Sequence, residues 1–176
     1  MLPDQDRELL TAYVDGVLSS RQRRHVAKLL KLSTHERHMV EDMILWHLRP
    51  GYLGDFKVPS ERAVFRFFRD AKEEAASILL LSIADQRATL GPLSTKRDGK
   101  HHEKICKMLI AKFFEKKNEK PVERLITGHD LIKKLKLAPS PIFAKILREV
   151  EEAQVLGKIA TKQEALELAG KIGDRN

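Results

Sequence analysis

Apolar residues recur every three or four positions along most of this chain, which is the spacing that gathers them on one face of an α-helix. In the first third, the spacing holds in three runs, residues 9–18, 26–30 and 39–47. No segment shows the strict alternation of apolar and polar residues that is typical of a half-buried β-strand. The pattern therefore predicts an all-α protein that begins as a helical bundle.

Capping residues, prolines and glycines mark where these helices are expected to begin and end. Ser33 or Thr34 is suited to cap the helix that follows it. Pro50-Gly51 predicts that this helix ends there and that a loop follows. A long basic helix is expected over residues 101–117, bounded on its N-terminal side by Asp98-Gly99.

The last third of the chain contains three predicted helix starts. Asp130 can reach back to the amide of Thr127, which is the reciprocal arrangement of a capping box, and Glu164 can do the same for Thr161. Between them, the prolines on either side of Ser140 restart the chain before a longer helix. Each start exposes backbone amides and the positive end of the helix dipole, which can hold phosphate, although most helix starts bind no ligand.

The charge of the chain is unevenly distributed. The 176 residues carry a formal net charge of +8. Residues 1–95 hold 14 lysines and arginines against 13 acids, whereas residues 96–176 hold 19 against 12. Acids outnumber bases after residue 148, so a polyanion is expected to bind near residues 96–148. The alternative is that these lysines only solvate the faces of helices.

Two parts of the chain are predicted, residues 1–92 as a helical bundle and residues 99–176 as a basic helical body and tail. No apolar run reaches the roughly 18–20 residues that a bilayer span requires, so no membrane partner is expected. The acidic N-terminus does not have the pattern of a secretory signal, and the single cysteine, Cys106, excludes an intrachain disulfide. These features favour the cytoplasm.

Sequence signatures of catalysis are missing from the chain. It has no nucleophile elbow, P-loop, dinucleotide-binding glycine motif or HExxH motif, so hydrolase, ATPase and dehydrogenase functions have no support and no cofactor is predicted. His101, His102 and Cys106 could be considered a zinc cluster, but structural zinc takes four ligands and catalytic zinc at least three. With a single cysteine in a basic helix, these residues are interpreted as no metal site. The adjacent pair His129-Asp130 is interpreted as part of a helix start.

Several short sequence motifs, in their order and spacing, resemble those of one protein family. They are His47 to Gly51 (HLRPG), Pro59 to Ala63 (PSERA), Leu79 to Asp85 (LLLSIAD), Leu125 to Ile132 (LITGHDLI), Glu152-Ala153-Gln154, and Thr161 to Leu166 (TKQEAL). Together they resemble the C-terminal half of bacterial tRNA nucleotidyltransferases and poly(A) polymerases that carry an HD-type domain. The resemblance runs from about Arg21 to Ile172.

The resemblance implies no catalytic activity for these residues alone. The family's catalytic head uses paired carboxylates on two magnesium ions, and no such head is recognised here, so the chain is expected not to be an enzyme by itself. His47 and Asp85 lie where the resemblance places late members of the HD-type metal site. Two ligands would hold a divalent ion weakly, so these positions are interpreted as a remnant without metal. A residual HD phosphohydrolase is the least favoured function.

The resulting hypothesis is a non-catalytic RNA-binding module whose partner is tRNA or another structured RNA. Lysines suit phosphate contact as point charges. The predicted contact residues are Lys104, Lys107, Lys112, Lys116, Lys133, Lys134, Lys136, Lys145 and Arg148, with the helix starts at Thr127 and Ser140 as phosphate seats. The alternative is a helical interaction domain that pairs with another protein, such as a separately encoded nucleotidyltransferase head, or with a second copy of itself.

Overall fold

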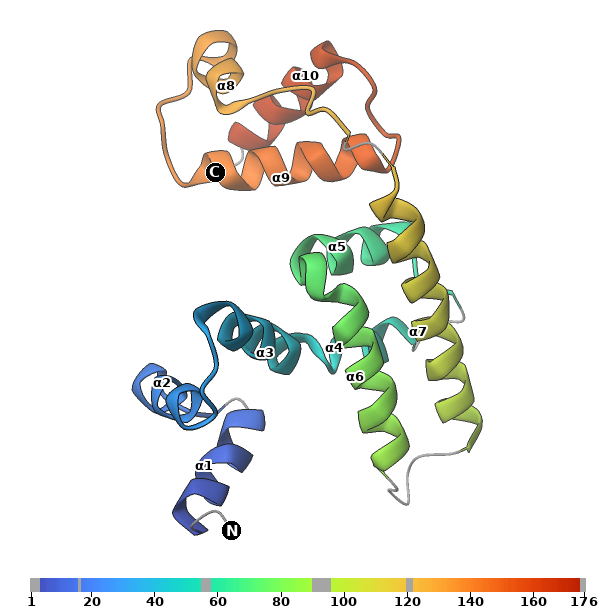
Figure 1. Ribbon diagram of the computed structural model, residues 1–176. Helices are drawn as coiled ribbons and strands as arrows, with labels where there is room; N and C mark the ends of the chain where they lie inside the picture. Colours follow the sequence, from blue (N-terminus) through green and yellow to red (C-terminus); the bar gives the residue numbers. More distant parts are fainter. Residues whose placement is uncertain (1–3, 16, 55–57, 90–95, 120–121, 175–176) are drawn as a thin grey trace. The chain divides into compact units, whose positions relative to one another are not determined.

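The computed structural model describes residues 4–15, 17–54, 58–89, 96–119 and 122–174 (Figure 1). The helices are α1 (Asp4–Val14), α2 (Ser20–Leu29), α3 (Thr34–Trp46), α4 (Arg49–Gly54), α5 (Glu61–Ala71), the 3₁₀ helix η1 (Lys72–Glu74), α6 (Ala75–Ala88), α7 (Lys96–Lys117), α8 (Gly128–Leu135), α9 (Ile142–Val155) and α10 (Lys162–Gly173). No strand occurs among these residues, which confirms the predicted all-α class.

The contacts of the chain divide it into two compact units. The first unit contains the residues up to Pro59 together with Phe67–Lys116, and the second contains Ser60–Arg66 together with the residues from Lys117 onward. The division falls within α5 and at the end of α7, so α7 groups with the helices before it. The predicted parts, residues 1–92 and 99–176, place α7 with the tail instead, and their separate roles stay a prediction.

In the first unit, α6 and α7 run alongside each other (Figure 1). The buried side chains of α6 include Ile78 and Leu79, and those of α7 include Ile105 and Leu109. The Arg87 guanidinium Nη2 donates to Glu103 Oε2 at 2.7 Å and joins the two helices at their surface. A smaller cluster around Tyr13, Leu18 and Val26 packs α1 against α2. These apolar contacts hold the first unit together because they remove nonpolar surface from water.

Two expectations about helix ends in the first unit are wrong. A loop was expected from Pro50, but this proline lies in the first turn of α4, where its missing N–H has no intrahelical partner to lose. Gly99 was expected to precede the long basic helix, but α7 begins at Lys96 and Gly99 lies inside its first turns. A single glycine costs a helix only about 1 kcal/mol relative to alanine, and the remaining 21 residues of α7 outweigh that cost.

Ser33, and not Thr34, caps α3. The amide of Glu36 donates to Ser33 Oγ at 3.2 Å, and the Glu36 carboxylate accepts from the Ser33 amide at 2.8 Å. These bonds satisfy amides that would otherwise have no partner at the start of the helix. One of the two residues proposed from the sequence is therefore selected by the geometry.

The second unit packs α8, α9 and α10 around one apolar core. Its fully or nearly buried members are Ile126, Leu131, Ile146, Val150, Ala165, Ala169 and Ile172. Gly157 follows α9 with φ of +66°, the left-handed conformation in which glycine carries no steric penalty. The capping pairs predicted at Thr127 and Thr161 are present at the starts of α8 and α10.

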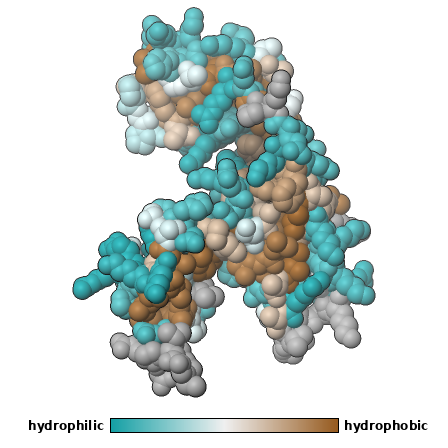
Figure 2. Space-filling view, in the orientation of Figure 1, coloured by the Kyte–Doolittle hydropathy of each residue, from teal (hydrophilic) through white to brown (hydrophobic). Residues whose placement is uncertain are grey.

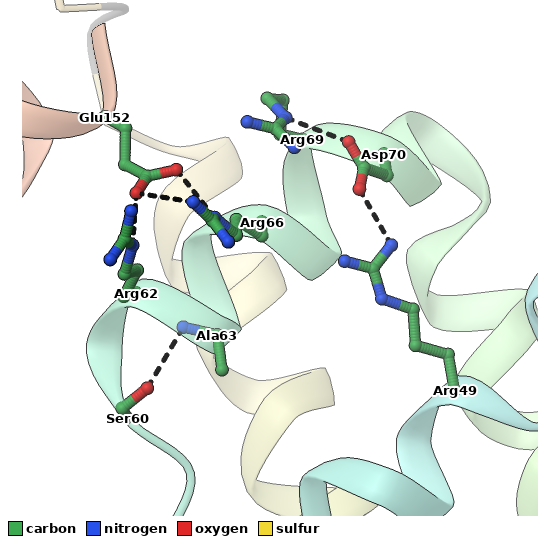
Figure 3. A network of polar contacts seen from close by, with 8 residues as sticks. All are labelled: Arg49, Ser60, Arg62, Ala63, Arg66, Arg69, Asp70 and Glu152. Carbon is green, nitrogen blue, oxygen red and sulfur yellow. Dashed lines mark hydrogen bonds and ion pairs between the residues drawn. The ribbon is translucent and has the colours of Figure 1, made fainter. Parts of the chain in front are cut away.

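Two separate groups of ion pairs lie near α5 (Figure 3). In the second unit, the carboxylate of Glu152 on α9 accepts from Arg62 and Arg66. In the first unit, Asp70 accepts from Arg69 Nε and from Arg49 Nη1, both at 2.8 Å. Bonds from guanidinium to carboxylate are stronger than neutral hydrogen bonds, so each carboxylate fixes part of α5 within its own unit.

Candidate nucleic-acid interface

The predicted lysines of α7 all lie at the surface of the first unit. Lys104, Lys107, Lys112 and Lys116 are exposed. At 100° per residue they spread over about half of the circumference of the helix and do not form a narrow stripe. On the same scale, the buried positions Ile105, Cys106 and Leu109 cover about 100° of the helix and adjoin the positions of Lys112 and Lys116. The helix thus offers a broad basic surface and keeps its apolar side in the core.

The four predicted contact lysines of α7 differ in what surrounds them. Lys107 Nζ lies 2.7 Å from Glu103 Oε1. The bonds from Lys107 and then Arg87 hold the pKa of Glu103 at about 2, so this carboxylate is charged throughout the physiological range and offsets part of the positive charge of Lys107. Lys104 and Lys112 form no ion pair among the described residues. Of the four predicted lysines of α7, these two are therefore the most available to an external anion.

A second basic group lies in the second unit, on α8, α9 and the residue after α8. Lys133, Lys134, Lys136, Lys145 and Arg148 are all exposed. Lys133 and Lys134 occupy the last turn of α8, where cations also stabilise the negative end of the helix dipole. Lys136 ends the helix in the left-handed conformation, with φ of 57°. These three lysines have a structural role at the C-terminus of α8 in addition to any contact with a ligand.

The helix start at Thr127 already carries an anion of its own. Asp130 Oδ2 accepts from the amide and from the hydroxyl of Thr127, both at 2.9 Å. Asp130 Oδ1 lies 2.6 Å from Lys162 Nζ. The bonds from Lys162 and then Thr127 hold the pKa of Asp130 at about 2, so the carboxylate is ionised. A phosphate at this end of α8 would face a fixed negative charge.

Ser140 does not cap α9. The N-cap of that helix is Pro141, which provides no side-chain hydrogen bond, and the amide of Phe143 donates to the Ser140 carbonyl at 3.1 Å. The geometry therefore gives no support to Ser140 as a phosphate seat. The case for a nucleic-acid interface rests on the exposed cations and not on the two helix starts.

The predicted metal-site remnant, His47 and Asp85, comes together in one pocket of the first unit. The pocket has a volume of about 520 Å³ and is also lined by Tyr13, Asp15 and Glu41, among other residues. His47 Nδ1 lies 2.7 Å from the carbonyl of Ile44. Within the described residues, no three histidine, cysteine or acidic side chains are grouped as a metal site. The participation of Tyr13 has no signal in the sequence, because its place in the helical pattern is that of any core residue.

His102 and Cys106 meet inside the first unit. His102 Nε2 lies 3.2 Å from Ser82 Oγ and 3.4 Å from Cys106 Sγ. Burial, followed by the charge of Glu103, raises the pKa of the Cys106 thiol to about 12. Burial also lowers the pKa of His102. The cluster is a set of buried polar contacts in which the cysteine remains a thiol.

The described residues thus define an all-α protein with exposed basic surfaces on both units. Residues 94–169 match the family model described as tRNA nucleotidyltransferase domain 2, putative. A segment of 49 residues, 28% of this chain, is 49% identical to the CC-adding tRNA nucleotidyltransferase of Synechocystis sp.. A segment of 100 residues, 57% of this chain, is 30% identical to the A-adding tRNA nucleotidyltransferase of Deinococcus radiodurans.

These similarities confirm, for part of the chain, the relationship to tRNA nucleotidyltransferases that the sequence phrases indicated. The matched segments span 12% of the Synechocystis protein and 23% of the Deinococcus protein. No solved structure matches this chain. None of the described helices is long and apolar enough to cross a bilayer.

Proposed function

We propose that these 176 residues bind structured RNA, with tRNA as the first candidate, and that they contribute binding and no nucleotidyl transfer. The proposal rests on the overlap of two features of the sequence, the match to a family model and the basic region. The segment that matches the tRNA nucleotidyltransferase model, residues 94–169, contains the basic region at residues 96–148 and every predicted contact lysine.

The exposed cations suit contact with phosphates. Six of the predicted residues are exposed and form no ion pair among the described residues: Lys104, Lys112, Lys133, Lys134, Lys136 and Arg148. Five of these six are lysines, which act as point charges and carry no base specificity of their own. Binding is therefore expected to depend on the RNA backbone and on salt more than on sequence.

The salt dependence of binding gives a quantitative test. If each of the six cations neutralises one phosphate, the slope of log K against log salt is expected to be about −4 to −5, at roughly 0.7 to 0.9 per contact. Fluorescence anisotropy with labelled tRNA, between low and physiological potassium chloride, measures this slope. A slope near zero, or no binding at low salt, would refute the proposal.

A pair of double variants locates the interface. Lys133→Gln with Lys134→Gln is expected to make the slope shallower by about 1.4 to 1.8, the share of two contacts. The matched control is Lys158→Gln with Lys171→Gln, which removes the same charge from exposed positions of the second unit outside residues 96–148. If the control pair reduces the slope equally, net charge and not this surface governs binding.

The absence of nucleotidyl transfer is tested separately. The purified chain, mixed with magnesium, a tRNA that lacks its 3′ end and labelled CTP or ATP, is expected to incorporate no label. Incorporation that copurifies with the chain through successive columns would show that it carries chemistry as well as binding.

One observation favours a second candidate function, a helical interaction domain. Large apolar side chains of the first unit are exposed, including Leu45 (66%), Leu48 (57%) and Tyr52 (69%). Figure 2 shows hydrophobic surface on helices of this unit. Light scattering after size-exclusion chromatography tests self-association. A dimer that dissociates on Leu45→Asp while tRNA affinity stays absent would favour this function over RNA binding.

A further inference from the structure

Exposed residues of α7 form a straight stripe along the helix, within the first unit. They follow one another at alternating spacings of four and three residues, and they are Lys100, Lys104, Lys107, Ala111 and Phe114. At 100° per residue they fall within an arc of about 80°, and at 1.5 Å per residue the stripe is about 21 Å long. Three cations thus precede an aromatic ring on one line of the helix.

The lysines at the start of the stripe are available to an anion. Lys100 and Lys104 form no ion pair among the described residues. Lys107 Nζ lies 2.7 Å from Glu103 Oε1, so its charge is partly offset. The N-terminal end of the stripe therefore carries two free positive charges, which suit a polyanion that runs along the helix.

Phe114, at the other end of the stripe, lies away from the core side of α7. Its exposed fraction is 53%, and at 100° per residue it lies about 140° around the helix from the fully buried Leu109. Much of the side chain is therefore open to another molecule.

A series of ring contacts fixes Phe114 at this surface. Its ring meets Phe113 edge to face, with the centroids 5.4 Å apart. Phe113 contacts Phe68 at 6.0 Å, and Phe68 contacts the fully buried Phe67 at 5.6 Å. Aromatic pairs are stabilising at about 4.5–7 Å between centroids. A ring that is already held by such contacts loses little conformational freedom when another flat ring packs against it.

The surroundings of Phe114 favour a nucleotide over a protein as its partner. The core of a protein–protein interface is depleted in lysine and buries several apolar side chains together. On this stripe, Phe114 is the one large apolar residue, and the other members are three lysines and an alanine. Proteins hold unpaired bases with this combination, because the aromatic ring stacks on the base while the cations contact the backbone.

We propose that Phe114 stacks on an unpaired base of a bound RNA strand whose phosphates contact Lys100 and Lys104. This inference rests on the proposed RNA binding, and it adds a preference for a single-stranded segment. At about 3.4 Å per stacked nucleotide, a stripe of about 21 Å accommodates up to about six nucleotides. Every base has a flat face, so the preference is for unpaired structure and not for a particular sequence.

Fluorescence anisotropy at low salt tests the proposal with two probes, a labelled single-stranded RNA of about 12 nucleotides and the blunt duplex that it forms with its complement. Phe114→Leu is expected to raise Kd for the single strand at least about fivefold, which corresponds to about 1 kcal/mol, the lower limit for one stacked base. Kd for the duplex is expected to stay unchanged, because its bases are already stacked on one another. Phe114→Tyr keeps a flat ring and is expected to bind the single strand as the wild-type chain does.

The matched control is Tyr52→Leu, which removes an exposed aromatic ring from α4, outside the stripe. It is expected to leave both Kd values unchanged. Equal weakening by Tyr52→Leu and Phe114→Leu would overturn the inference, and so would equal weakening of the two probes by Phe114→Leu. A dimer that dissociates on Phe114→Leu, measured by light scattering, would also overturn it, because the ring would then lie in a contact between two copies.

The lysines of the stripe are tested with the same single strand. Lys100→Gln with Lys104→Gln is expected to make the slope of log K against log salt shallower by about 1.4, at about 0.7 per contact. An unchanged slope would overturn the placement of the strand along the stripe. If the duplex binds with the expected salt dependence but Phe114→Leu has no effect on the single strand, this inference fails and the proposed function stands. If neither RNA binds at low salt, both fail.

Discussion

Replacing Glu152 tests the most heavily engaged buried charge of the second unit. Its residue is only 5% exposed, and its carboxylate accepts from Arg66 Nε at 2.7 Å, from Arg66 Nη2 at 3.1 Å and from Arg62 Nε. Glu152→Gln keeps the size of the side chain but removes the charge that three donors share. The variant is therefore expected to lower the stability of the second unit.

The size of this loss of stability follows from how exposed the two arginine partners of Glu152 are. Removing one partner of a fully buried ion pair costs about 3–5 kcal/mol, whereas an exposed pair contributes at most about 1 kcal/mol. The side chains of Arg62 and Arg66 are 56% and 43% exposed, so water compensates much of what they lose. We expect the free energy of unfolding to fall by about 1–2 kcal/mol at pH 7.

The pH dependence has a definite sign. Burial by itself would raise the pKa of Glu152, but the bonds from Arg66 and Arg62 outweigh it and leave the pKa below its usual value. A depressed pKa means that the stabilisation is complete above the unfolded value, about 4.3, and is lost as the pH falls through the folded value. The difference between the wild-type chain and Glu152→Gln is therefore expected to vanish in acid.

The assay can separate the two units. Trp46, the single tryptophan, lies in the first unit, so its fluorescence reports unfolding there, whereas far-UV circular dichroism reports helices of both units. In urea denaturation, Glu152→Gln is expected to show a dichroism transition at lower urea than the wild-type chain and an unchanged fluorescence transition. Glu149→Gln, an exposed change on the same helix, is the control. A loss below about 0.3 kcal/mol at pH 7, far under the expected cost, would refute the reasoning.

Two further predictions concern the first unit. Gly99→Ala is expected to stabilise the chain by up to about 1 kcal/mol in thermal or urea unfolding, because alanine favours the helix. Only the flexible end of the Gln86 side chain must move to make room for the added methyl group. Destabilisation would show that Gln86 cannot move aside. Cys106, which is buried and has a pKa of about 12, is expected to react with a disulfide reagent only after denaturation. Rapid reaction of the native chain would show that the α6 and α7 pair opens readily.

The sequence by itself determined the helical class and many of the helix starts. The capping pairs at Thr127 and Thr161 were predicted correctly because each depends on side chains three residues apart, and such contacts are local. The relationship to tRNA nucleotidyltransferases was also visible in short phrases of the sequence. The roles of the exposed lysines stay a prediction, because exposure alone does not distinguish a binding surface from a solvated one.

Only the tertiary structure decided which distant residues meet. The bonds of Glu152 with Arg62 and Arg66 join positions 90 and 86 residues apart, and one pocket gathers Tyr13 with Asp85 from α1 and α6. Helical periodicity shows which face of a helix is buried but not against which neighbour. The choice of neighbour depends on how the apolar faces of all the helices pack together, and that packing is a property of the whole chain.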